Sequence, residues 1–262
     1  MAARAGLVTG GSSGIGKALA RALGQEGYAI TIAARDEMKL ARAAEELRAE
    51  GVAVQPVCAD LADEQAIEVL VAKHAAAYGR MDALVNSAAD GTAGLRIADL
   101  PSDVLDHNLD VNLRAQFLTL RAALPMLERA GAEHGKALVV NVSSMAAKSG
   151  APGLSFYAAA KAGVNALTQS AQMELRDAGV QLTILSPGFT ATPMSAWARA
   201  AGVQPEEMVQ PDDLGEALRF LLRTSSTCLV REIELVPRAQ DDIIRRLAAW
   251  RAAERPDTRV ER

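Results

Sequence analysis

A tyrosine and a lysine stand four residues apart in the stretch Ser155-Phe-Tyr-Ala-Ala-Ala-Lys161. If this stretch is helical, the spacing puts the phenol of Tyr157 and the ammonium of Lys161 on one face, one turn apart. A free tyrosine has a pKa near ~10, and a cation about 4 Å away at an effective dielectric of about 20 stabilises the phenolate by roughly 4 kcal/mol. The phenol of Tyr157 is therefore predicted to gain and lose its proton near neutral pH. Taken alone, the same spacing also describes an ordinary contact on a helix surface.

A glycine-rich turn, Thr9-Gly-Gly-Ser-Ser-Gly-Ile-Gly16, lies between a short apolar run and an amphipathic segment near the start of the chain. Glycine permits positive φ and lets the backbone approach a pyrophosphate, and the unpaired N–H groups of a helix start favour an anion. In this strand, turn and helix context the turn predicts dinucleotide binding. The alternative is a tight turn that only packs a helix on a strand. The residues predicted to contact the cofactor here are Gly10, Ser12, Ser13, Gly14, Ile15 and Gly16.

The end of the second apolar run, Ala34-Arg35-Asp36, contains evidence for two different dinucleotides. Asp36 lies about twenty residues after the glycine turn, where an acid binds the ribose 2′-hydroxyl of NAD. However, Asp36 is also a suitable N-cap for the helix that follows, and Arg35 is the cation that the 2′-phosphate of NADP needs. Because Ala34 carries no acid to repel that phosphate, we expect NADP rather than NAD.

Two later strand ends supply further candidate cofactor contacts. We expect Asp60 and Leu61 to lie beside the adenine, although Asp60 also suits a helix cap. Asn86 closes the fourth apolar run in Asp82-Ala-Leu-Val-Asn-Ser-Ala-Ala89, where small residues let the backbone lie against the cofactor. Asn86 has a structural alternative too, in which its side chain ties neighbouring strands together.

Short β-branched apolar runs alternate with longer helical patterns along the chain. The expected strands lie near 5–9, 28–34, 52–58, 82–86, 136–143, 180–186 and 229–236. The expected helices lie near 14–26, 37–50, 63–78, 101–130, 155–178 and 211–224. Each strand is followed by a crossover long enough to bring the next strand parallel. The pattern predicts an α/β fold of the Rossmann-like, doubly wound type, with about seven parallel strands and helices on both faces.

No repeat, linker or shift in composition divides these units, so we expect a single dinucleotide-binding and catalytic domain over 1–238. Residues 239–262 are expected to form an extension, with a helix near 241–255 and a mobile polar end at 256–262.

The segment 188–210 is longer than a typical connection and suits a substrate lid. Its large apolar side chains either form an apolar substrate pocket or cover exposed core. These side chains are Phe189, Met194, Trp197 and Met208.

Composition narrows the choice of partners. The 262-residue chain has 50% hydrophobic residues, 3% aromatic residues and a net charge of −4, with acids and bases interspersed. No basic stripe suggests contacts to a phosphate backbone, so we expect no nucleic-acid partner. No apolar run approaches the roughly 18 residues of a membrane span, and the first residues leave no room for a signal peptide. We therefore expect a cytoplasmic protein that does not enter a membrane.

Cysteines and histidines give no sign of a disulfide framework or a metal site. Cys58 and Cys228 are expected to be reduced, buried thiols. His74, His107 and His134 are scattered without ligand spacing, and we expect them on solvated helix faces. No metal is predicted.

Together these motifs resemble the short-chain dehydrogenase/reductase family, from about residue 5 to about residue 236. Arg35 resembles the arginine of NADP-preferring members. The chain departs from the family pattern in two places. Asn86-Ser-Ala-Ala89 replaces the usual Asn-Asn-Ala-Gly. Glu234-Leu-Val-Pro-Arg238 replaces the usual Asp-Gly-Gly ending, and this second departure puts assembly and substrate closure in doubt. The motifs that carry the likeness are the glycine turn, Asn86, Asn112 in Asp110-Val-Asn-Leu113, Ser144 in Asn141-Val-Ser-Ser144, the Tyr157/Lys161 pair and Ser186-Pro-Gly-Phe-Thr-Ala-Thr192.

The resemblance implies a role for each of four residues. Tyr157 would be the general acid/base, and Lys161 would lower its pKa and hold the nicotinamide ribose. Ser144 would hydrogen-bond the substrate carbonyl, and Asn112 would hold a water that connects Lys161 to solvent. Ser143 is a rival serine, but the thirteen-residue spacing to Tyr157 matches the family through Ser144. The expected nicotinamide contacts are Pro187, Gly188, Thr190 and Thr192, together with Tyr157 and Lys161.

The implied roles agree with the chemistry of the residues. Hydride transfer to a carbonyl develops negative charge on oxygen, which a hydroxyl donor and a proton-donating phenol stabilise. We predict an NADP-dependent oxidoreductase that interconverts a ketone or aldehyde and an alcohol. The alternatives are an NAD-dependent dehydrogenase of the same family and a catalytically silent dinucleotide-binding regulator. We expect a small-molecule substrate, and an alanine-rich helix near Ala158 and Ala162 suits packing in a homodimer or homotetramer.

Overall fold

Strands and helices alternate through the computed structural model, which describes residues 4–91 and 94–254. The strands are β1 Ala5–Thr9, β2 Ala29–Ala34, β3 Val54–Cys58, β4 Ala83–Asn86, β5 Ala137–Val142, β6 Val180–Pro187 and β7 Glu232–Leu235. The α-helices are α1 Gly14–Gln25, α2 Glu37–Ala49, α3 Glu64–Tyr78, α4 Ser102–Leu109, α5 Ala115–His134, α6 Ser155–Leu175, α7 Pro211–Arg223 and α8 Gln240–Glu254. Shorter turns are η1 Ile97–Asp99, η2 Asp110–Arg114, η3 Met145–Ala147, η4 Arg176–Ala178, η5 Pro193–Ala201 and η6 Pro205–Glu207.

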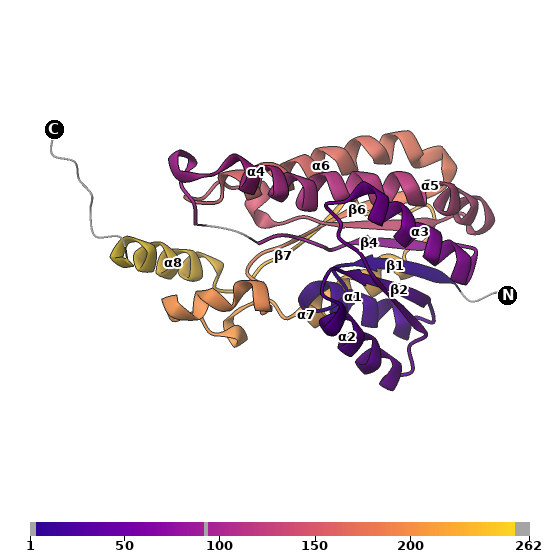
Figure 1. Ribbon diagram of the computed structural model, residues 1–262, viewed down its shortest axis with the longest axis horizontal. Helices are drawn as coiled ribbons and strands as arrows, with labels where there is room; N and C mark the ends of the chain where they lie inside the picture. The colour runs from indigo at the N-terminus through magenta and orange to yellow at the C-terminus, as the bar shows by residue number, and fades with distance from the viewer. Residues whose placement is uncertain (1–3, 92–93, 255–262) are drawn as a thin grey trace.

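All seven strands join one parallel sheet in the order β3-β2-β1-β4-β5-β6-β7, which confirms the predicted doubly wound fold. Helices α1, α2 and α7 cover one face, and α3, α5 and α6 cover the other, as Figure 1 shows. Each face buries its own aliphatic core, because both sides of a parallel sheet must be shielded from water. Aromatic side chains contribute little to either core.

The strand order reverses between β1 and β4, and the carboxyl ends of these strands lie level. Thr9 is paired in register with Asn86, and Asn86 with Asn141. Ligands of open α/β sheets bind in the crevice outside such a switch point. The register therefore brings the glycine turn and the loops after β4, β5 and β6 to one place.

The helix expected over 101–130 is interrupted. The structure has α4, then a π turn at Asp110–Arg114, and then α5, which continues to His134. A π turn adds one residue to a helical turn and changes the facing of the side chains that follow. No proline or glycine lies within 110–114 to signal it, so periodicity alone predicts one helix.

Burial of three sequence-predicted residues differs from expectation. His74 is fully buried rather than solvated: its Nδ1 is 2.8 Å from Thr31 Oγ1 and its Nε2 is 2.9 Å from the Arg80 carbonyl oxygen. A carbonyl only accepts, so Nε2 carries the proton of a neutral ring, and burial lowers the pKa of His74 to about 4. Cys58 and Cys228 are exposed rather than buried, because one ends a strand at the sheet edge and the other precedes β7.

The other two histidines fit the expectation to different degrees. His107 on α4 is 40% exposed, as expected of a solvated helix face. His134 at the end of α5 is 21% exposed and lies 2.6 Å from Arg80 Nη2, so it is only partly solvated.

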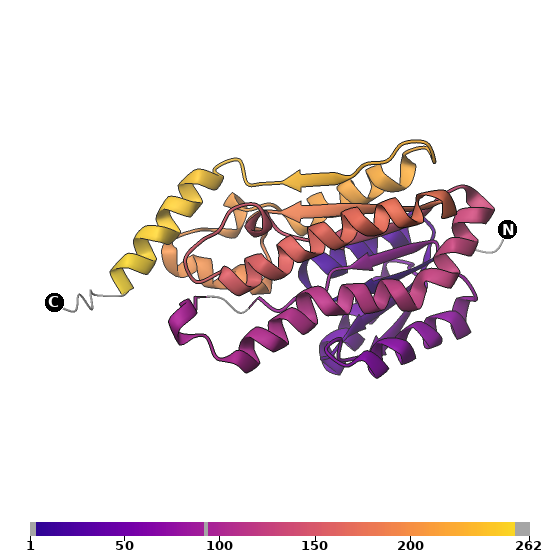
Figure 2. The same ribbon diagram turned by 90° about the horizontal axis from the view of Figure 1, so that it is seen from above.

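The lid segment and the C-terminal helix form a separate layer, here called the cap, made of η5, η6 and α8. Figure 2 shows α8 beyond the carboxyl end of β7. Ile243 and Leu247 of α8 pack with Ala198, Val203 and Met208 in a small apolar cluster of their own. The expected helix near 241–255 is thus present as α8, whereas the polar end at 256–262 lies outside the described residues.

The described residues include neither a membrane-spanning helix nor a metal-binding cluster. Within 4–91 and 94–254, none of the helices combines the length and apolar composition that crossing a membrane requires. In the same ranges, no cluster of three or more histidine, cysteine, aspartate or glutamate side chains is placed to hold a metal ion. The division of the chain at residue 238 stays a prediction.

Candidate active site

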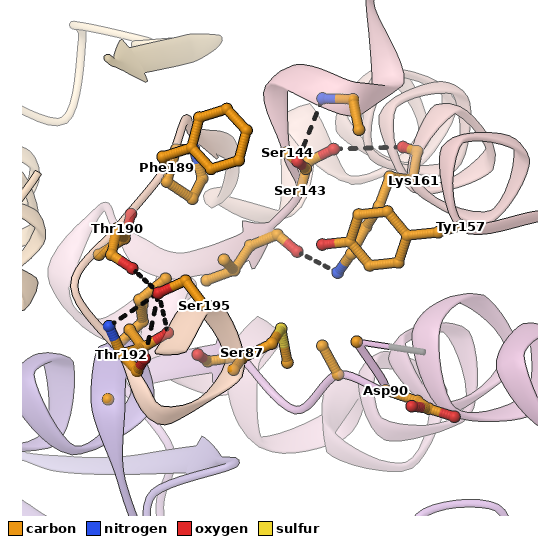
Figure 3. Close-up of a pocket in the computed structure, with 18 of the residues that line it drawn as sticks. Ser87, Asp90, Ser143, Ser144, Tyr157, Lys161, Phe189, Thr190, Thr192 and Ser195 are labelled. Atoms are coloured by element: carbon orange, nitrogen blue, oxygen red, sulfur yellow. Dashed lines mark hydrogen bonds between the residues drawn. The ribbon is translucent and has the colours of Figure 1, made fainter. Parts of the chain in front are cut away.

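A cavity of about 750 Å³ opens at the carboxyl ends of the strands. Its walls come from the glycine turn, the ends of β2 and β3, the loops after β4, β5 and β6, the start of α6, and α8. The volume lies within the range of ~300–1,000 Å³ that is usual for ligand sites. Figure 3 shows the part where the loops after β5 and β6 face Tyr157 and Lys161.

The glycine turn leaves its backbone bare toward the cavity. Gly10 and Gly14 have φ values of 70° and 51°, which L side chains rarely adopt. A Cβ on Gly16 would lie 2.2 Å from the Gly10 carbonyl oxygen, so no side chain fits there. Ser13 occupies the N-cap of α1 without a side-chain capping bond, and the first N–H groups of the helix remain available to an anion.

Most residues predicted to contact the cofactor share this cavity. Asn86 is not among the described lining residues. It is 1% exposed and donates from Nδ2 to Asn141 Oδ1 at 2.9 Å, which is the strand-tying alternative that its sequence position allowed. The predicted residues that line the cavity are Gly10, Ser12, Ser13, Gly14, Ile15, Gly16, Arg35, Asp60, Leu61, Pro187, Gly188, Thr190 and Thr192.

The residues that distinguish the two dinucleotides are separated in space. Arg35 lines the cavity, is exposed, and has no ion-pair partner among the described residues. Asp36 instead accepts the Lys39 backbone N–H at 3.0 Å and caps α2. Asp60 has both roles proposed for it, because it lines the cavity and accepts the Ala62 N–H at 3.0 Å. Over residues 4–91 and 94–254, this end of the cavity therefore offers Arg35 as a cation without an ion-pair partner and Asp60 as a carboxylate.

Ser144, Tyr157 and Lys161 meet on the same wall. Ser144 ends the extended segment after β5 and accepts the Ala146 N–H at 3.1 Å, while α6 presents Tyr157 and Lys161 from successive turns. Lys161 Nζ lies 5.8 Å from the Tyr157 ring centroid, and Figure 3 shows their polar ends directed into the same part of the cavity. The rival Ser143 is 2% exposed and donates to the Lys161 carbonyl oxygen at 3.2 Å. Ser144 thus has the hydroxyl better placed toward Tyr157.

Electrostatics in this cluster differ from the sequence prediction. Burial raises the pKa of Tyr157, and the hydrogen bond from Ser144 partly offsets that rise; no lowering by Lys161 contributes. Lys161 is 1% exposed, donates to the Val142 carbonyl oxygen at 2.9 Å, and has its own pKa lowered to about 8 by burial. A lowered phenol pKa requires a solvated ammonium about 4 Å away, but both groups lie in the protein interior, where desolvation dominates.

Asn112 sits behind this wall rather than on it. The π turn at Asp110–Arg114 buries it completely, and its side chain binds the Asp90 backbone twice, at 3.0 Å to the carbonyl and 3.2 Å from the N–H. Val111 of the same turn lines the cavity. The expected water relay through Asn112 stays a prediction, and the contacts show a residue that holds the loop after β4.

The lid and α8 supply a wall that the sequence analysis identified only in part. Phe189, Met194 and Trp197 line the cavity as one of the two sequence interpretations requires, whereas Met208 is buried in the cap. No α8 residue was predicted to be part of the site. The signal was present, because the lining residues recur at helical spacing on one face. They are Gln240, Ile244, Leu247, Ala248 and Arg251.

The residues present fit a dinucleotide. The bare glycine backbone, the uncapped start of α1 and the free Arg35 provide donors where phosphates would lie. Thr9 Oγ1 accepts the N–H groups of Ser87 and Ala88 at 3.0 and 3.2 Å and holds the loop after β4 beside the turn. Small side chains therefore cover this end, despite the departure from the usual Asn-Asn-Ala-Gly.

Comparison with known proteins agrees with this geometry. The family profile described as short chain dehydrogenase matches residues 4–201. An uncharacterized oxidoreductase of Staphylococcus aureus (strain MW2) is 31% identical over 231 residues, which cover 88% of this chain and 96% of the relative.

Solved structures of the same kind superpose on most of the chain. An alcohol dehydrogenase from the archaeon Thermococcus sibiricus, complexed with 5-hydroxy-NADP, has a TM-score of 0.80 at 30% identity, covering 90% of this chain and 97% of its own. A 3-ketoacyl-(acyl-carrier-protein) reductase from Brucella melitensis, complexed with NADH, has a TM-score of 0.79 at 27% identity, covering 88% and 96%. The similar structures thus include complexes of both dinucleotide types.

Proposed function

Because the chain belongs to the short-chain dehydrogenase/reductase family, we propose that this oxidoreductase interconverts a ketone or aldehyde and an alcohol, with NADP as the hydride carrier. The observation that carries the proposal is the convergence of Ser144, Tyr157 and Lys161 on the cavity that the glycine turn opens. When bound, the nicotinamide supplies the hydride for reduction or accepts it for oxidation.

Tyr157 acts as the acid in the reduction. Since burial raises its pKa, the phenol is protonated at neutral pH and ready to donate. Its proton goes to the carbonyl oxygen as hydride reaches the carbonyl carbon, and the Ser144 hydroxyl donates a hydrogen bond to the same oxygen. The product is the alcohol, and the proton lost by Tyr157 is replaced from solvent.

Lys161 stabilises the phenolate that remains after proton transfer. Its ammonium lies 5.8 Å from the ring centroid inside the protein, where charge interactions are stronger than in water. The resting pair is neutral phenol and ammonium, so the attraction develops only as the phenol ionises. An interaction that strengthens along the reaction lowers the barrier rather than only binding substrate.

Arg35 supports NADP as the preferred dinucleotide. Arg35 lines the cavity and pairs with no carboxylate in the part of the chain that the structure describes, and Asp36 is occupied as a helix cap. The homo-oligomeric state and the cytoplasmic location stay predictions.

Tyr157→Phe tests the assigned acid. We expect oxidation of NADPH against a panel of ketones and aldehydes to fall by about 10²- to 10⁴-fold, as loss of a general acid does. Binding of NADPH, measured by calorimetry, should stay within about twofold of the wild type. Tyr78→Phe is the matched control, since this tyrosine donates to the Ile30 carbonyl at 3.1 Å and lies outside the cavity lining.

Two outcomes would contradict the proposal in different ways. Undiminished turnover in Tyr157→Phe would refute the assignment of Tyr157 as the general acid. Tight NADPH binding by the wild type without turnover of any carbonyl would indicate the catalytically silent regulator.

A further inference from the structure

Helix α8 forms the outer wall of the cavity. Its face of Gln240, Ile244, Leu247 and Arg251 is turned to the cavity, and the Trp250 ring stacks on Trp197 of η5 at 6.2 Å between centroids. At the near end, the Gln240 side chain touches Gly188, which follows β6. Arg251 lies eleven residues further on, or about 16 Å along the helix axis. The cavity therefore extends well beyond the catalytic wall.

Arg251 differs from the other arginines of α8. Arg245 pairs with Asp242 at 3.3 Å, and Arg246 pairs with Glu207 at 2.5 Å. Arg251 has no carboxylate within ion-pair distance among the described residues, although it lines the cavity. Its guanidinium lies 5.3 Å from the Trp197 ring centroid and donates once, from Nη1 to the Pro152 carbonyl oxygen at 3.1 Å.

The guanidinium is held in place with donors to spare. An arginine has five N–H donors in a rigid planar fork, and the contact to Pro152 uses one of them. The Trp197 ring and the Pro152 carbonyl fix the group between η5 and the loop before α6, so little side-chain freedom remains to be lost on binding. Such a fork matches the planar oxygens of a carboxylate or the oxygens of a phosphate.

Apolar side chains line the same cavity as the catalytic residues and Arg251. They include Leu154, Phe189, Met194 and Ile244. Among the described lining residues, the carboxylates are Asp60 and Asp90, which come from the loops after β3 and β4. One cavity thus combines the proposed carbonyl-reducing centre, an apolar lining and an arginine.

We propose that Arg251 binds an anionic group, a carboxylate or a phosphate, of a carbonyl substrate whose apolar body lies along α8. The inference rests on the proposed function and specifies its substrate class: an oxo compound with the carbonyl at one end and the anion at the other.

The first test compares acids with neutral partners. Unbranched methyl-ketone acids of increasing length are assayed against their methyl esters, and hydroxyketone phosphates against the free alcohols, by NADPH oxidation. In the wild type, kcat/KM for the preferred anion should exceed that of its neutral partner, and Arg251→Met should lower that ratio by about 10- to 100-fold, as loss of a charge-assisted hydrogen bond does. Arg251→Lys should retain part of the ratio. Arg245→Met is the matched control, because it removes the same charge from an exposed position of the same helix.

The second test needs no turnover. The chain has two tryptophans, Trp197 and Trp250, and both lie beside Arg251 in the cap. Titration with each methyl-ketone acid and hydroxyketone phosphate of the series should change their fluorescence for at least one member, with a Kd that rises about 10- to 100-fold in Arg251→Met and not in Arg245→Met.

The outcomes separate the two proposals. Reduction of neutral ketones with equal ratios in the wild type and Arg251→Met overturns the anion site and leaves the proposed function standing. Failure of every carbonyl to react sinks the proposed function, and the fluorescence titration then still decides whether Arg251 binds the anion.

Discussion

The two ends of the cavity are built by different means. At the cofactor end, the backbone itself is the site: a Cβ at Gly16 has no room, and the turn is continuous with strands whose side chains are fully buried. At the substrate end, the cap is held by side chains that approach from distant parts of the chain, such as Trp197 with Trp250 and Glu207 with Arg246. A site made of backbone tolerates few substitutions, whereas contacts between side chains can be replaced by other pairs of side chains.

The glycine turn and the sheet are rigid parts of this protein, whereas the cap is the part that tolerates change. The cap has a small apolar cluster of five buried residues, separate from the two large cores on the sheet. A layer with so little buried surface has a low local stability and opens more readily than the sheet. If Arg251 binds the substrate as proposed, substrate choice resides in the part of the molecule that is least costly to alter.

Gly16→Ala should have the largest effect, because it places a methyl group 2.2 Å from the Gly10 carbonyl oxygen. We expect NADPH affinity to fall by more than about 100-fold and the free energy of unfolding by more than about 2 kcal/mol, measured by calorimetry and urea denaturation. Gly215→Ala in α7 is the control: a Cβ there meets Ala22 at an ordinary 3.5 Å, and alanine should stabilise the helix by up to about 1 kcal/mol. A Gly16→Ala protein with normal NADPH binding would show that the turn is not a cofactor cradle.

Acidic pH should lower the free energy of unfolding through protonation of His74, which is buried against the sheet. Its pKa is lowered from 6.5 to about 4 in the folded protein, so the unfolded chain takes up the proton first as the pH falls. The stability that the neutral ring contributes is complete above pH 6.5 and is lost between 6.5 and about 4, by about 3 kcal/mol. Urea denaturation at several pH values should show this loss in the wild type and in the control His107→Gln, but much less of it in His74→Gln. Equal pH dependence in all three proteins would contradict it.

Arg35→Ala tests the cofactor end at a single side chain. We expect NADPH affinity to fall by about 10- to 100-fold, since a charge-assisted hydrogen bond to the 2′-phosphate is lost, while NADH affinity changes by less than about twofold. Fluorescence titration with each dinucleotide measures both. Arg42→Ala, an exposed arginine outside the cavity lining, is the control. Equal losses for the two dinucleotides would favour the NAD-dependent alternative.

The smallest effect should come from Arg246→Met in the cap. Arg246 joins α8 to Glu207 of η6 at 2.5 Å, and an ion pair that water can still reach contributes little to stability because solvent screens it. We expect tryptophan fluorescence, which reports the cap, to change at lower urea than far-UV circular dichroism, and the gap to widen in Arg246→Met but not in Arg245→Met. Coincident transitions in every variant would show that the cap and the sheet unfold together.

The cofactor end was largely predictable from the sequence because its signals are local. A strand, a glycine turn and a helix follow one another directly, so Gly10, Gly14 and Gly16 lie on the cavity as predicted. Arg35 and Asp60 also line the cavity, since each follows a strand whose carboxyl end must reach the same edge, and their contacts to a cofactor stay predictions. The α6 spacing correctly brought Tyr157 and Lys161 to one wall.

The features that escaped prediction depend on three-dimensional surroundings. The pKa of Tyr157 follows from burial that spacing does not encode, and Asn112 is turned inward by a π turn that has no composition signal. The sequence shows His74 only as a histidine within a helix, and its burial follows from contacts with Thr31 and the Arg80 carbonyl, which come from other elements. Arg251 lies 54 residues after Trp197, so their contact is invisible to any local pattern.

The π turn at Asp110–Arg114 has a consequence for the length of the chain. Its extra residue sets the rotational phase between α4 and α5, about 100° per residue in a regular helix. Removing one residue would straighten the helix and rotate all of α5 against the sheet, which no single side-chain exchange there would do. The segment is therefore constrained in how many residues it contains, in addition to the requirement for Asn112 at its buried position.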